Sequence, residues 1–237
     1  MRILLTGGTG NLGSEIKKHI SCYAPTSDEL DITNLQSCLK ACEKYIPNIV
    51  IHCAGYVNSA EAEIEKDLCW SVNVVGTENM VEAFPFSRFI YISSDYVFDG
   101  EKGNYTEEDI PNPINFYGLT KLIAETIVKK HENSLILRAP FRNNPPWRFP
   151  KAFTDQYTSC SFVKDRAKDI VDVINNFPFT GILHIGGPRR SIYEMAKEAS
   201  PDIGEMKRSE FPAVRIPRDT SLNSEKWNLL EQKIVQK

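Results

Sequence analysis

The sequence predicts an α/β fold in which a parallel sheet is covered by helices on both faces. Up to Pro140, short apolar segments typical of buried strands alternate with longer segments of helical periodicity. A glycine-rich turn, Gly7 to Gly13, joins the first strand to the first helix. A β-α-β order of this kind favours parallel strands whose connecting helices lie on the faces of the sheet.

The predicted strands are short apolar runs, and the predicted helices lie between them. The strands are Arg2–Thr6, Ile49–Cys53, Arg88–Ser93 and Leu135–Arg138, with a weaker segment at Ser21–Pro25. The helices are Leu12–Ile20, Leu35–Tyr45, Asp67–Ala83 and Phe116–His131. Thr33 precedes the second helix, where a threonine can accept hydrogen bonds from free backbone N–H groups.

The pattern changes after Pro140, because residues 143–150 contain three prolines and are typical of a loop. The elements expected after this loop are helices at Ala167–Asn176 and Ile192–Ala199, a strand at Ile182–Ile185, and an extended tail, Phe211–Leu222, before a last short helix. We therefore expect a main domain over residues 1–140. Residues 141–237 are expected to form a small, reduced C-terminal lobe that is interleaved with the main domain rather than folding separately.

Composition and charge exclude several classes of protein. The chain has 237 residues and a net charge of -3, so no basic surface indicates binding to nucleic acid or to an anionic membrane. Apolar runs such as Phe89–Ile92 are far shorter than the roughly 20 residues of a membrane-spanning helix. Met1 leads directly into the first strand and leaves no room for a secretory signal. The expected location is the cytoplasm.

Cysteine and histidine residues do not form a metal-binding pattern. The six cysteines have no paired spacing and are expected to be reduced thiols. Cys38 and Cys42 share a helix face, but no second Cys or His pair follows at zinc-site spacing. We predict no metal site, and we expect the four histidines to be structural or on the surface.

The glycine-rich turn is the first motif that indicates a ligand. Glycines permit a tight turn and let backbone N–H groups approach a pyrophosphate. Gly7, Gly10 and Gly13 follow a strand and open a helix, which is the setting of a dinucleotide-binding turn. On this basis residues 1–140 are interpreted as a dinucleotide-binding domain; the alternative is a glycine-rich turn without a ligand.

Two further motifs indicate proton transfer and carbonyl binding. Tyr117 and Lys121 are four residues apart, so they share one face of a helix. A nearby ammonium group favours the phenolate and is expected to lower the pKa of the tyrosine from about 10. Ser93 and Ser94 follow a buried strand, where a hydroxyl can donate a hydrogen bond to a substrate carbonyl. The alternatives are a surface tyrosine beside a solvated lysine, and serines that only cap the next segment.

These motifs belong to longer segments that carry a resemblance to a known family. The segments are Gly7–Gly13, Glu29–Thr33, His52–Tyr56, Val72–Thr77, Ser93–Gly100, Tyr117–Glu125 and Ile216–Leu222. With them the sequence resembles the extended short-chain dehydrogenase/reductase family, and within it the dTDP-4-dehydrorhamnose reductases. The resemblance implies a Rossmann-type doubly wound parallel sheet followed by the small substrate lobe.

The resemblance also implies a reaction and a role for each site residue. The reaction is reduction of the C4 ketone of a nucleotide-activated 4-keto-6-deoxy sugar by NADPH or NADH, without a metal. Tyr117 would be the proton donor, Lys121 its partner, which also touches the nicotinamide ribose, and Ser94 the hydrogen-bond donor to the keto oxygen. The implied cofactor-binding residues are Gly7, Gly10, Asn11, Leu12, Gly13, Asp31, Ile32, Cys53, Ala54, Gly55, Tyr56, Tyr117, Lys121, Ala139 and Pro140. The implied substrate contacts are Ser94, Tyr96, Phe98, Trp147 and Arg218.

Two departures from the family pattern bear on the cofactor and on the second lobe. No acidic residue closes the second strand segment, where a carboxylate would hold the ribose of NAD; Thr26 and Ser27 lie there instead, which favours NADPH slightly. The chain is also shorter than the usual relatives after Trp147, which affects the substrate lobe and any homodimer interface.

Two other functions fit the same resemblance. The regulatory subunit of methionine adenosyltransferase resembles these reductases and acts by binding protein. Retention of Ser94, Tyr117 and Lys121 together favours catalysis, because a binding subunit has no chemical need for that set. A nucleotide-sugar epimerase uses the same three residues, and only the segments at 94–100 and 216–222 favour the reductase over it.

Overall fold

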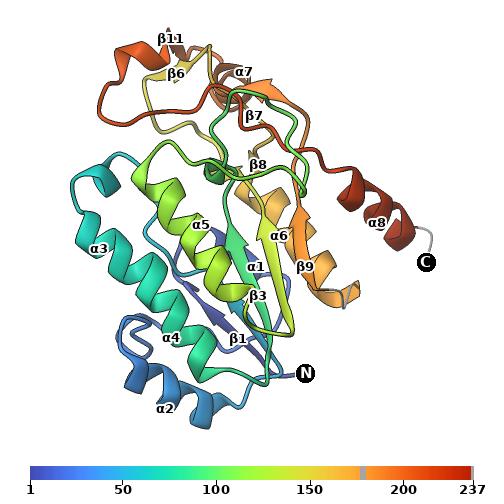
Figure 1. Cartoon of the computed structure of the whole chain (residues 1–237). Coiled ribbons are helices and arrows are strands. Elements are labelled where there is room, and N and C mark those ends of the chain that lie inside the picture. The colour runs from blue at the N-terminus through green and yellow to red at the C-terminus, as the bar shows by residue number, and fades with distance from the viewer. Residues whose placement is uncertain (177–179, 236–237) are drawn as a thin grey trace.

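A parallel sheet of five strands forms the centre of the computed structural model, which describes residues 1–176 and 180–235 (Figure 1). In spatial order the strands are β1 (Ile3–Thr6), β2 (Ile49–His52), β3 (Arg88–Ser93), β4 (Ser134–Arg138) and β9 (Gly181–His184). All four neighbouring pairs are parallel. The four main predicted strands are therefore confirmed, and the short strand predicted at 182–185 extends the main sheet.

The weak strand predicted at Ser21–Pro25 was wrong in extent. Only Tyr23 pairs with β1, through one bridge to Leu4. The Tyr23 N–H donates to the Ile3 carbonyl, and the Tyr23 carbonyl accepts from the Leu5 N–H, both at 2.8 Å. Pro25 has no N–H to continue a ladder.

The helices follow the predicted segments with shifted ends. They are α1 (Asn11–Ile16), α2 (Leu35–Tyr45), α3 (Lys66–Trp70), α4 (Gly76–Ala83), α5 (Phe116–Val128), α6 (Val163–Asn176), α7 (Ile192–Ala199) and α8 (Glu225–Val235). The helix predicted at 67–83 consists of α3, a π-helical segment η2 (Ser71–Val75) and α4. Short 3-10 turns lie at η1 (Glu61–Glu63), η3 (Asp95–Val97) and η4 (Arg208–Glu210).

The residue that caps α2 is Asn34 rather than Thr33. The Asn34 side chain accepts hydrogen bonds from the N–H groups of Gln36 and Ser37. The Thr33 hydroxyl instead donates to the Asp31 carboxylate at 2.7 Å. The predicted cap was therefore one residue too early in the chain, because the Thr33 hydroxyl is hydrogen-bonded within the preceding turn.

Helices cover both faces of the sheet, as the doubly wound prediction requires. Alternate residues of β1 divide between two hydrophobic clusters: Ile3 and Leu5 pack with α1, α6 and α8, whereas Leu4 packs with α2, α4 and α5. A strand buried on both sides has no polar face, which explains the continuous apolar runs in the sequence. Figure 1 shows the two helical layers on either side of the strands.

The second lobe consists of three small sheets and α7, which lie beyond the carboxyl ends of the main strands (Figure 1). The pairs are β5 (Phe141–Arg142) with β8 (Ser161–Phe162), β6 (Lys151–Phe153) with β11 (Gly204–Met206), and β7 (Tyr157–Thr158) with β10 (Arg190–Ser191). The tail after η4 is largely extended and bridges Asp219 to Tyr157 and Leu222 to Tyr105. β9, α6 and α8 also come from the chain after residue 141, but β9 joins the main sheet and the two helices pack against it.

All six cysteines are free thiols, and Cys38, Cys69 and Cys160 are buried. Within residues 1–176 and 180–235, no helix has the length and hydropathy to cross a membrane. Across the same described part of the chain, no group of three or more His, Cys, Asp or Glu residues is arranged to hold a metal ion.

Two buried histidines make the stability of the fold depend on pH. His52 bonds the hydroxyls of Thr6 and Thr77 at 2.7 and 3.2 Å, and His184 lies against Arg138 at 3.2 Å. Burial lowers the pKa of His52 to about 3 and that of His184 to about 4. Both rings are therefore neutral in the folded protein, whereas in the unfolded chain they gain a proton below about pH 6.5.

The free energy of unfolding is expected to fall as the pH drops below about 6.5, because protons bind the unfolded chain preferentially. At pH 5 each histidine should cost about 2 kcal/mol relative to pH 8. Urea unfolding at pH 8, 6 and 5 measures this, with His19→Gln as the control, since His19 is exposed. Equal stability at pH 8 and 5 would contradict the neutral, buried state of both rings.

Candidate active site

The predicted site segments meet at one edge of the sheet. The glycine turn follows β1, residues 53–56 follow β2, Ser94 follows β3, and Ala139 with Pro140 follows β4. Because the strands are parallel, their carboxyl ends lie on the same edge, where open α/β sheets bind ligands. The N-terminal turn of α5 brings Tyr117 to this edge beside Tyr96, with ring centroids 6.0 Å apart.

The glycine turn is held by close backbone contacts at two of its glycines. Gly7 has φ +69°, and a Cβ on it would lie 2.7 Å from the Ala54 nitrogen. A Cβ on Gly13 would lie 2.3 Å from the Gly7 oxygen. These two positions therefore require glycine for the turn itself.

Gly10 differs, because its Cβ would meet only the Gly7 oxygen, at 3.3 Å. Protein packing does not explain a glycine there, so the open space is available to a ligand. The first intrahelical hydrogen bond of α1 runs from the Ser14 N–H to the Gly10 oxygen at 3.0 Å. The N–H groups of residues 11–13 precede that bond, so no carbonyl oxygen within the helix accepts them.

The segment after β2 is fixed by Asn73, a residue that the sequence analysis did not single out. Asn73 accepts a hydrogen bond from the Tyr56 N–H at 2.8 Å and donates to the Tyr56 oxygen at 3.0 Å. Its amide also donates to the Thr120 hydroxyl in α5 at 2.9 Å. Asn73 lies in the π-helical segment, a feature frequent at functional sites. These three hydrogen bonds, rather than a pattern in the sequence, reveal this role.

Ser94 lies at the start of η3 and connects three parts of the site. Its hydroxyl accepts the Tyr96 N–H at 3.1 Å and donates to Asp95 at 3.2 Å. The hydroxyl also lies close enough to Tyr117 to lower the pKa of that phenol. Ser94 therefore lies beside Tyr117 and caps η3, and its hydrogen bond to a substrate carbonyl stays a prediction.

Asp95 ties the second lobe to this segment. Its carboxylate accepts hydrogen bonds from the hydroxyls of Thr158 at 3.2 Å and Thr220 at 2.5 Å. Burial raises the pKa of Asp95 above its usual value, and the hydroxyl donors act in the opposite direction. The buried Asp95 carboxyl group thus contributes to the position of the lobe relative to Ser94, together with the Gln156 amide, which donates to the Tyr96 hydroxyl at 3.0 Å.

Lys121 is buried one helical turn after Tyr117. Its Nζ donates to the Ile92 carbonyl oxygen at 2.7 Å and lies 4.2 Å from the centre of the Tyr91 ring. Burial lowers the pKa of Lys121 to about 8, and the charge of Glu125 opposes that decrease. Lys121 therefore carries a positive charge for most of its population at neutral pH.

The predicted direction of the Tyr117 pKa was wrong for the protein without its ligands. Burial raises the pKa of Tyr117 well above 10, and the neighbouring Ser94 hydroxyl only partly opposes this. The Lys121 ammonium binds the Ile92 carbonyl instead of the phenol. Tyr117 is therefore protonated at neutral pH, which is the state a proton donor needs.

A buried ion pair supports the base of the site. Arg138 on β4 donates to both carboxylate oxygens of Glu125, at 2.9 and 2.7 Å, and both side chains are at most 1% exposed. The Ser93 hydroxyl adds a 2.6 Å hydrogen bond to Glu125. Two consecutive residues of β3 are thus bonded to α5. Ile92 accepts a hydrogen bond from Lys121, and Ser93 donates one to Glu125.

At the predicted adenine end of the site, the polar and apolar side chains lie in places that the sequence did not indicate. Asp31 is exposed and accepts hydrogen bonds from Thr33, whereas Ile32 is buried in the cluster beneath α4. The Thr26 N–H and hydroxyl both donate to the carboxylate of Glu29, at 2.9 and 3.3 Å. A carboxylate therefore does lie at this turn, and it is supplied by Glu29, three residues after Thr26.

Four predicted substrate contacts occupy different environments. Phe98 has no exposed surface and stacks on Tyr105 at 4.1 Å, so it packs in the core, and no observation supports its predicted substrate contact. Trp147 packs against the hydrophobic cluster of the lobe, although its buried indole N–H has no partner among the described residues. Tyr96 lies beside Tyr117, and Arg218 is exposed. Substrate contacts by these last three residues stay predictions.

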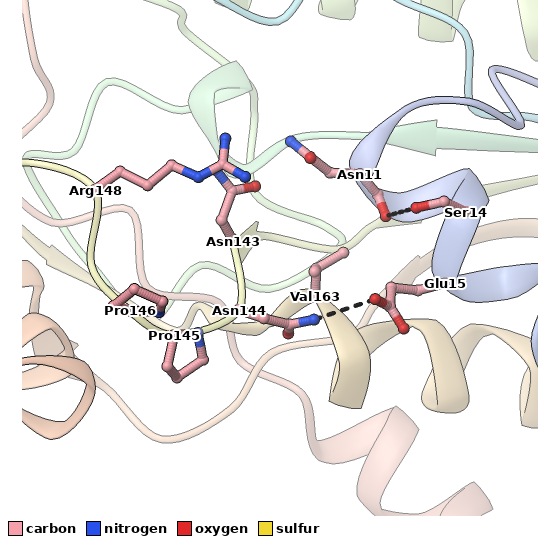
Figure 2. Close-up of a pocket in the computed structure, with 9 residues that line it drawn as sticks. All are labelled: Asn11, Ser14, Glu15, Asn143, Asn144, Pro145, Pro146, Arg148 and Val163. Atoms are coloured by element: carbon pink, nitrogen blue, oxygen red, sulfur yellow. Dashed lines mark hydrogen bonds between the residues drawn. The ribbon is translucent and has the colours of Figure 1, made fainter.

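A pocket of about 290 Å³ opens between the glycine turn and the loop after β5 (Figure 2). From the main domain it is lined by Asn11, Ser14, Glu15 and Val163. From the loop it is lined by Asn143, Asn144, Pro145, Pro146 and Arg148. Figure 2 shows the Arg148 side chain extending from the loop toward Asn143 and the glycine turn.

The doubly wound sheet, the glycine turn after β1, and Ser94, Tyr117 and Lys121 at the carboxyl edge together define an extended short-chain dehydrogenase/reductase. A family model described as the RmlD substrate binding domain matches residues 1–141. The chain belongs to this family.

Characterised relatives in the family have two kinds of name. The dTDP-4-dehydrorhamnose reductase of Aggregatibacter actinomycetemcomitans is 32% identical over 200 residues, 80% of this chain and 63% of that protein. Methionine adenosyltransferase 2 subunit beta of Xenopus laevis is 36% identical over 154 residues, 59% of this chain and 46% of that protein. The chain spans about half the length of several curated relatives that it matches.

Solved structures share the whole fold. A hypothetical dTDP-4-dehydrorhamnose reductase from Sulfolobus tokodaii has a TM-score of 0.86 and 31% identity, covering 97% of this chain and 94% of that one. The dTDP-4-dehydrorhamnose reductase of Bacillus anthracis in complex with NADP has a TM-score of 0.88 and 26% identity, covering 100% and 99%.

Proposed function

We propose that this protein is an NAD(P)H-dependent reductase of a nucleotide-activated 4-keto-6-deoxy sugar. The observation that carries the proposal is the position of the protonated Tyr117 phenol beside the Ser94 hydroxyl, at the sheet edge that also holds the glycine turn. A protonated phenol beside a second hydroxyl is the donor pair that a carbonyl oxygen requires. The named reductases among the relatives support the same reaction and the same class of substrate.

The residues around the glycine turn fit a nicotinamide dinucleotide. Gly10 leaves its space open, the N–H groups of residues 11–13 precede the first bond of α1, and residues 54–56 are fixed by Asn73. These groups would hold the diphosphate and one edge of the dinucleotide. When bound, the cofactor supplies a hydride to the carbonyl carbon of the substrate.

The chain's own residues supply orientation and the proton. Ser94 and Tyr117 hold the keto oxygen, and Tyr117 transfers its phenolic proton to that oxygen as the C=O group becomes CH–OH. The resulting phenolate is one negative charge in a buried site. Lys121, on the same face of α5, offsets the cost of that charge. The proton is regained from solvent before the next cycle.

The finer features of the proposal concern cofactor choice and assembly. We propose NADPH as the preferred cofactor, which Ser27 and the NADP complex of the Bacillus anthracis relative support. The Glu29 carboxylate, which accepts a hydrogen bond from the Thr26 N–H, is the group that opposes a preference for NADPH. The homodimer and the cytoplasmic location complete the proposal, with residues 1–140 as the cofactor domain and residues 141–237 as the substrate lobe.

A regulatory subunit is the second candidate function. The relatives named methionine adenosyltransferase 2 subunit beta, at up to 36% identity, favour it. A regulatory role requires neither the protonated Tyr117 nor a charged lysine buried beside it. Epimerases such as that of Thermus thermophilus, at 17% identity, support only the shared fold.

The test is oxidation of NADPH and of NADH with dTDP-4-keto-6-deoxy sugar made in situ. Oxidation that requires the sugar is the expected result, and the ratio of kcat/KM for the two cofactors gives the preference. Cofactor binding without sugar-dependent oxidation would move the assignment to the regulatory candidate. Sugar epimerised without net oxidation would move it to an epimerase.

Gly10→Val is expected to weaken dinucleotide binding without unfolding the protein. Gly10 has φ -76° and ψ 174°, which valine adopts readily, and its Cβ would meet only the Gly7 oxygen. The isopropyl group would fill the ligand space and raise the Kd for NADPH roughly tenfold or more, about 1.4 kcal/mol per factor of ten. Titration calorimetry measures the Kd, and the thermal midpoint is the folding control. A Kd equal to that of the wild type would remove the cofactor from this turn.

A further inference from the structure

The loop after β5 contributes the one cationic side chain of the pocket in Figure 2, Arg148. Its guanidinium has no hydrogen bond or ion pair with any residue in the described ranges 1–176 and 180–235. The only acid that lines the pocket is Glu15, and both of its oxygens accept hydrogen bonds from Lys18 at 2.9 Å. The charge of Arg148 is therefore available to a ligand.

The loop that carries Arg148 is fixed at two places. The Asn144 side chain accepts the Lys164 N–H at 3.1 Å and donates to Glu15 at 3.2 Å, which ties the loop to α6 and α1. The Trp147 N–H donates to the Ser200 hydroxyl at 3.1 Å, and the Trp147 ring packs on the lobe. Arg148, the next residue, therefore projects from an anchored backbone toward the glycine turn (Figure 2).

The remaining lining suits an oxyanion of limited size. Asn11, Ser14 and Asn143 supply polar side chains, and the volume of about 290 Å³ is at the low end for small-molecule sites, about 300–1,000 Å³. Such a pocket accommodates one segment of a dinucleotide rather than all of it. Arginine presents several N–H donors in a planar fork that matches phosphate oxygens.

We propose that Arg148 closes over the diphosphate of the bound dinucleotide, from the side opposite the glycine turn. The inference rests on the proposed function, because it assumes that the glycine turn binds the cofactor. A diphosphate is present in the cofactor and also in a nucleotide-sugar. The cofactor is the source to which the structure points, since Asn11 of the glycine turn lines the same pocket as Arg148.

Binding measurements on three ligands test the proposal without requiring turnover. Arg148→Ala should raise the Kd for NADPH, NADH and ADP-ribose by a similar factor, roughly ten- to a hundredfold for a lost charge-assisted hydrogen bond. Arg148→Lys should recover part of the affinity, because it restores the charge but not the fork. The Kd for thymidine diphosphate, measured with NADPH saturating, should stay unchanged.

Lys168→Ala is the matched control, since it removes one exposed positive charge from α6 and should leave every Kd at its wild-type value. Wild-type Kd values in Arg148→Ala would overturn the proposal. A loss confined to NADPH would assign Arg148 to the 2′-phosphate, and a loss confined to thymidine diphosphate would assign it to the sugar nucleotide; either result overturns it. A wild-type protein that binds none of the dinucleotides would instead refute the proposed function itself.

Discussion

Replacing Tyr117 by phenylalanine is expected to lower kcat by about two to four orders of magnitude, the range for removal of a general acid. The substitution removes the phenolic hydroxyl beside Ser94 and retains the ring that packs beside Tyr96. Binding of NADPH should change by less than about twofold, because the hydroxyl acts on the substrate carbonyl. Loss of the Tyr117 proton should thus lower turnover and leave cofactor affinity nearly unchanged.

Sugar-dependent oxidation of NADPH measures the turnover, and fluorescence titration measures the cofactor Kd. Tyr193→Phe provides the matched control, since it makes the same chemical change on α7 in the second lobe. Full turnover in Tyr117→Phe would exclude this residue as the proton donor. A large rise in the cofactor Kd would instead give Tyr117 a binding role.

Removing Glu125 is expected to produce the largest loss of stability in the molecule. The Arg138 guanidinium is 1% exposed, and Glu125 is its bidentate partner. Glu125→Ala leaves a buried positive charge without its counter-charge, which typically costs about 3–5 kcal/mol. The Ser93 hydroxyl loses its acceptor as well.

Urea unfolding gives the free energy, and Glu132→Ala controls for loss of an exposed glutamate near the end of α5. The double variant Glu125→Leu/Arg138→Met should regain much of the lost stability, because an apolar pair of similar volume often replaces a buried ion pair at little cost. If Glu125→Ala lowered the free energy of unfolding by less than about 1 kcal/mol, burial of the pair would be contradicted, because a loss that small is typical of a surface ion pair.

The sequence was sufficient for features that depend on neighbours in the chain. The apolar run Phe89–Ile92 predicted a strand buried on both faces, and β3 is such a strand. The spacing of Tyr117 and Lys121 placed both on α5, and Ser94 was predicted at the carboxyl end of β3. Their encounter at one edge follows from the parallel order of the strands.

Tertiary structure decided everything that depends on contacts between distant segments. Asn73 fixes residue 56 and contacts α5, Glu125 pairs with β4, and Arg148 lies opposite the glycine turn. None of these pairings has a fixed spacing in the sequence, so no local pattern reveals them.

The same reason explains two side-chain environments that the sequence did not predict. Phe98 was predicted to contact the substrate but is enclosed by Tyr105 and Arg138, and Tyr117 has a raised pKa because its surroundings exclude water. Backbone periodicity and turn chemistry are local properties, so the sequence by itself determined the sheet, its helices and the order of the site segments. Burial and charge pairing are set by the side chains that surround a group, and those neighbours exist only once the chain has folded.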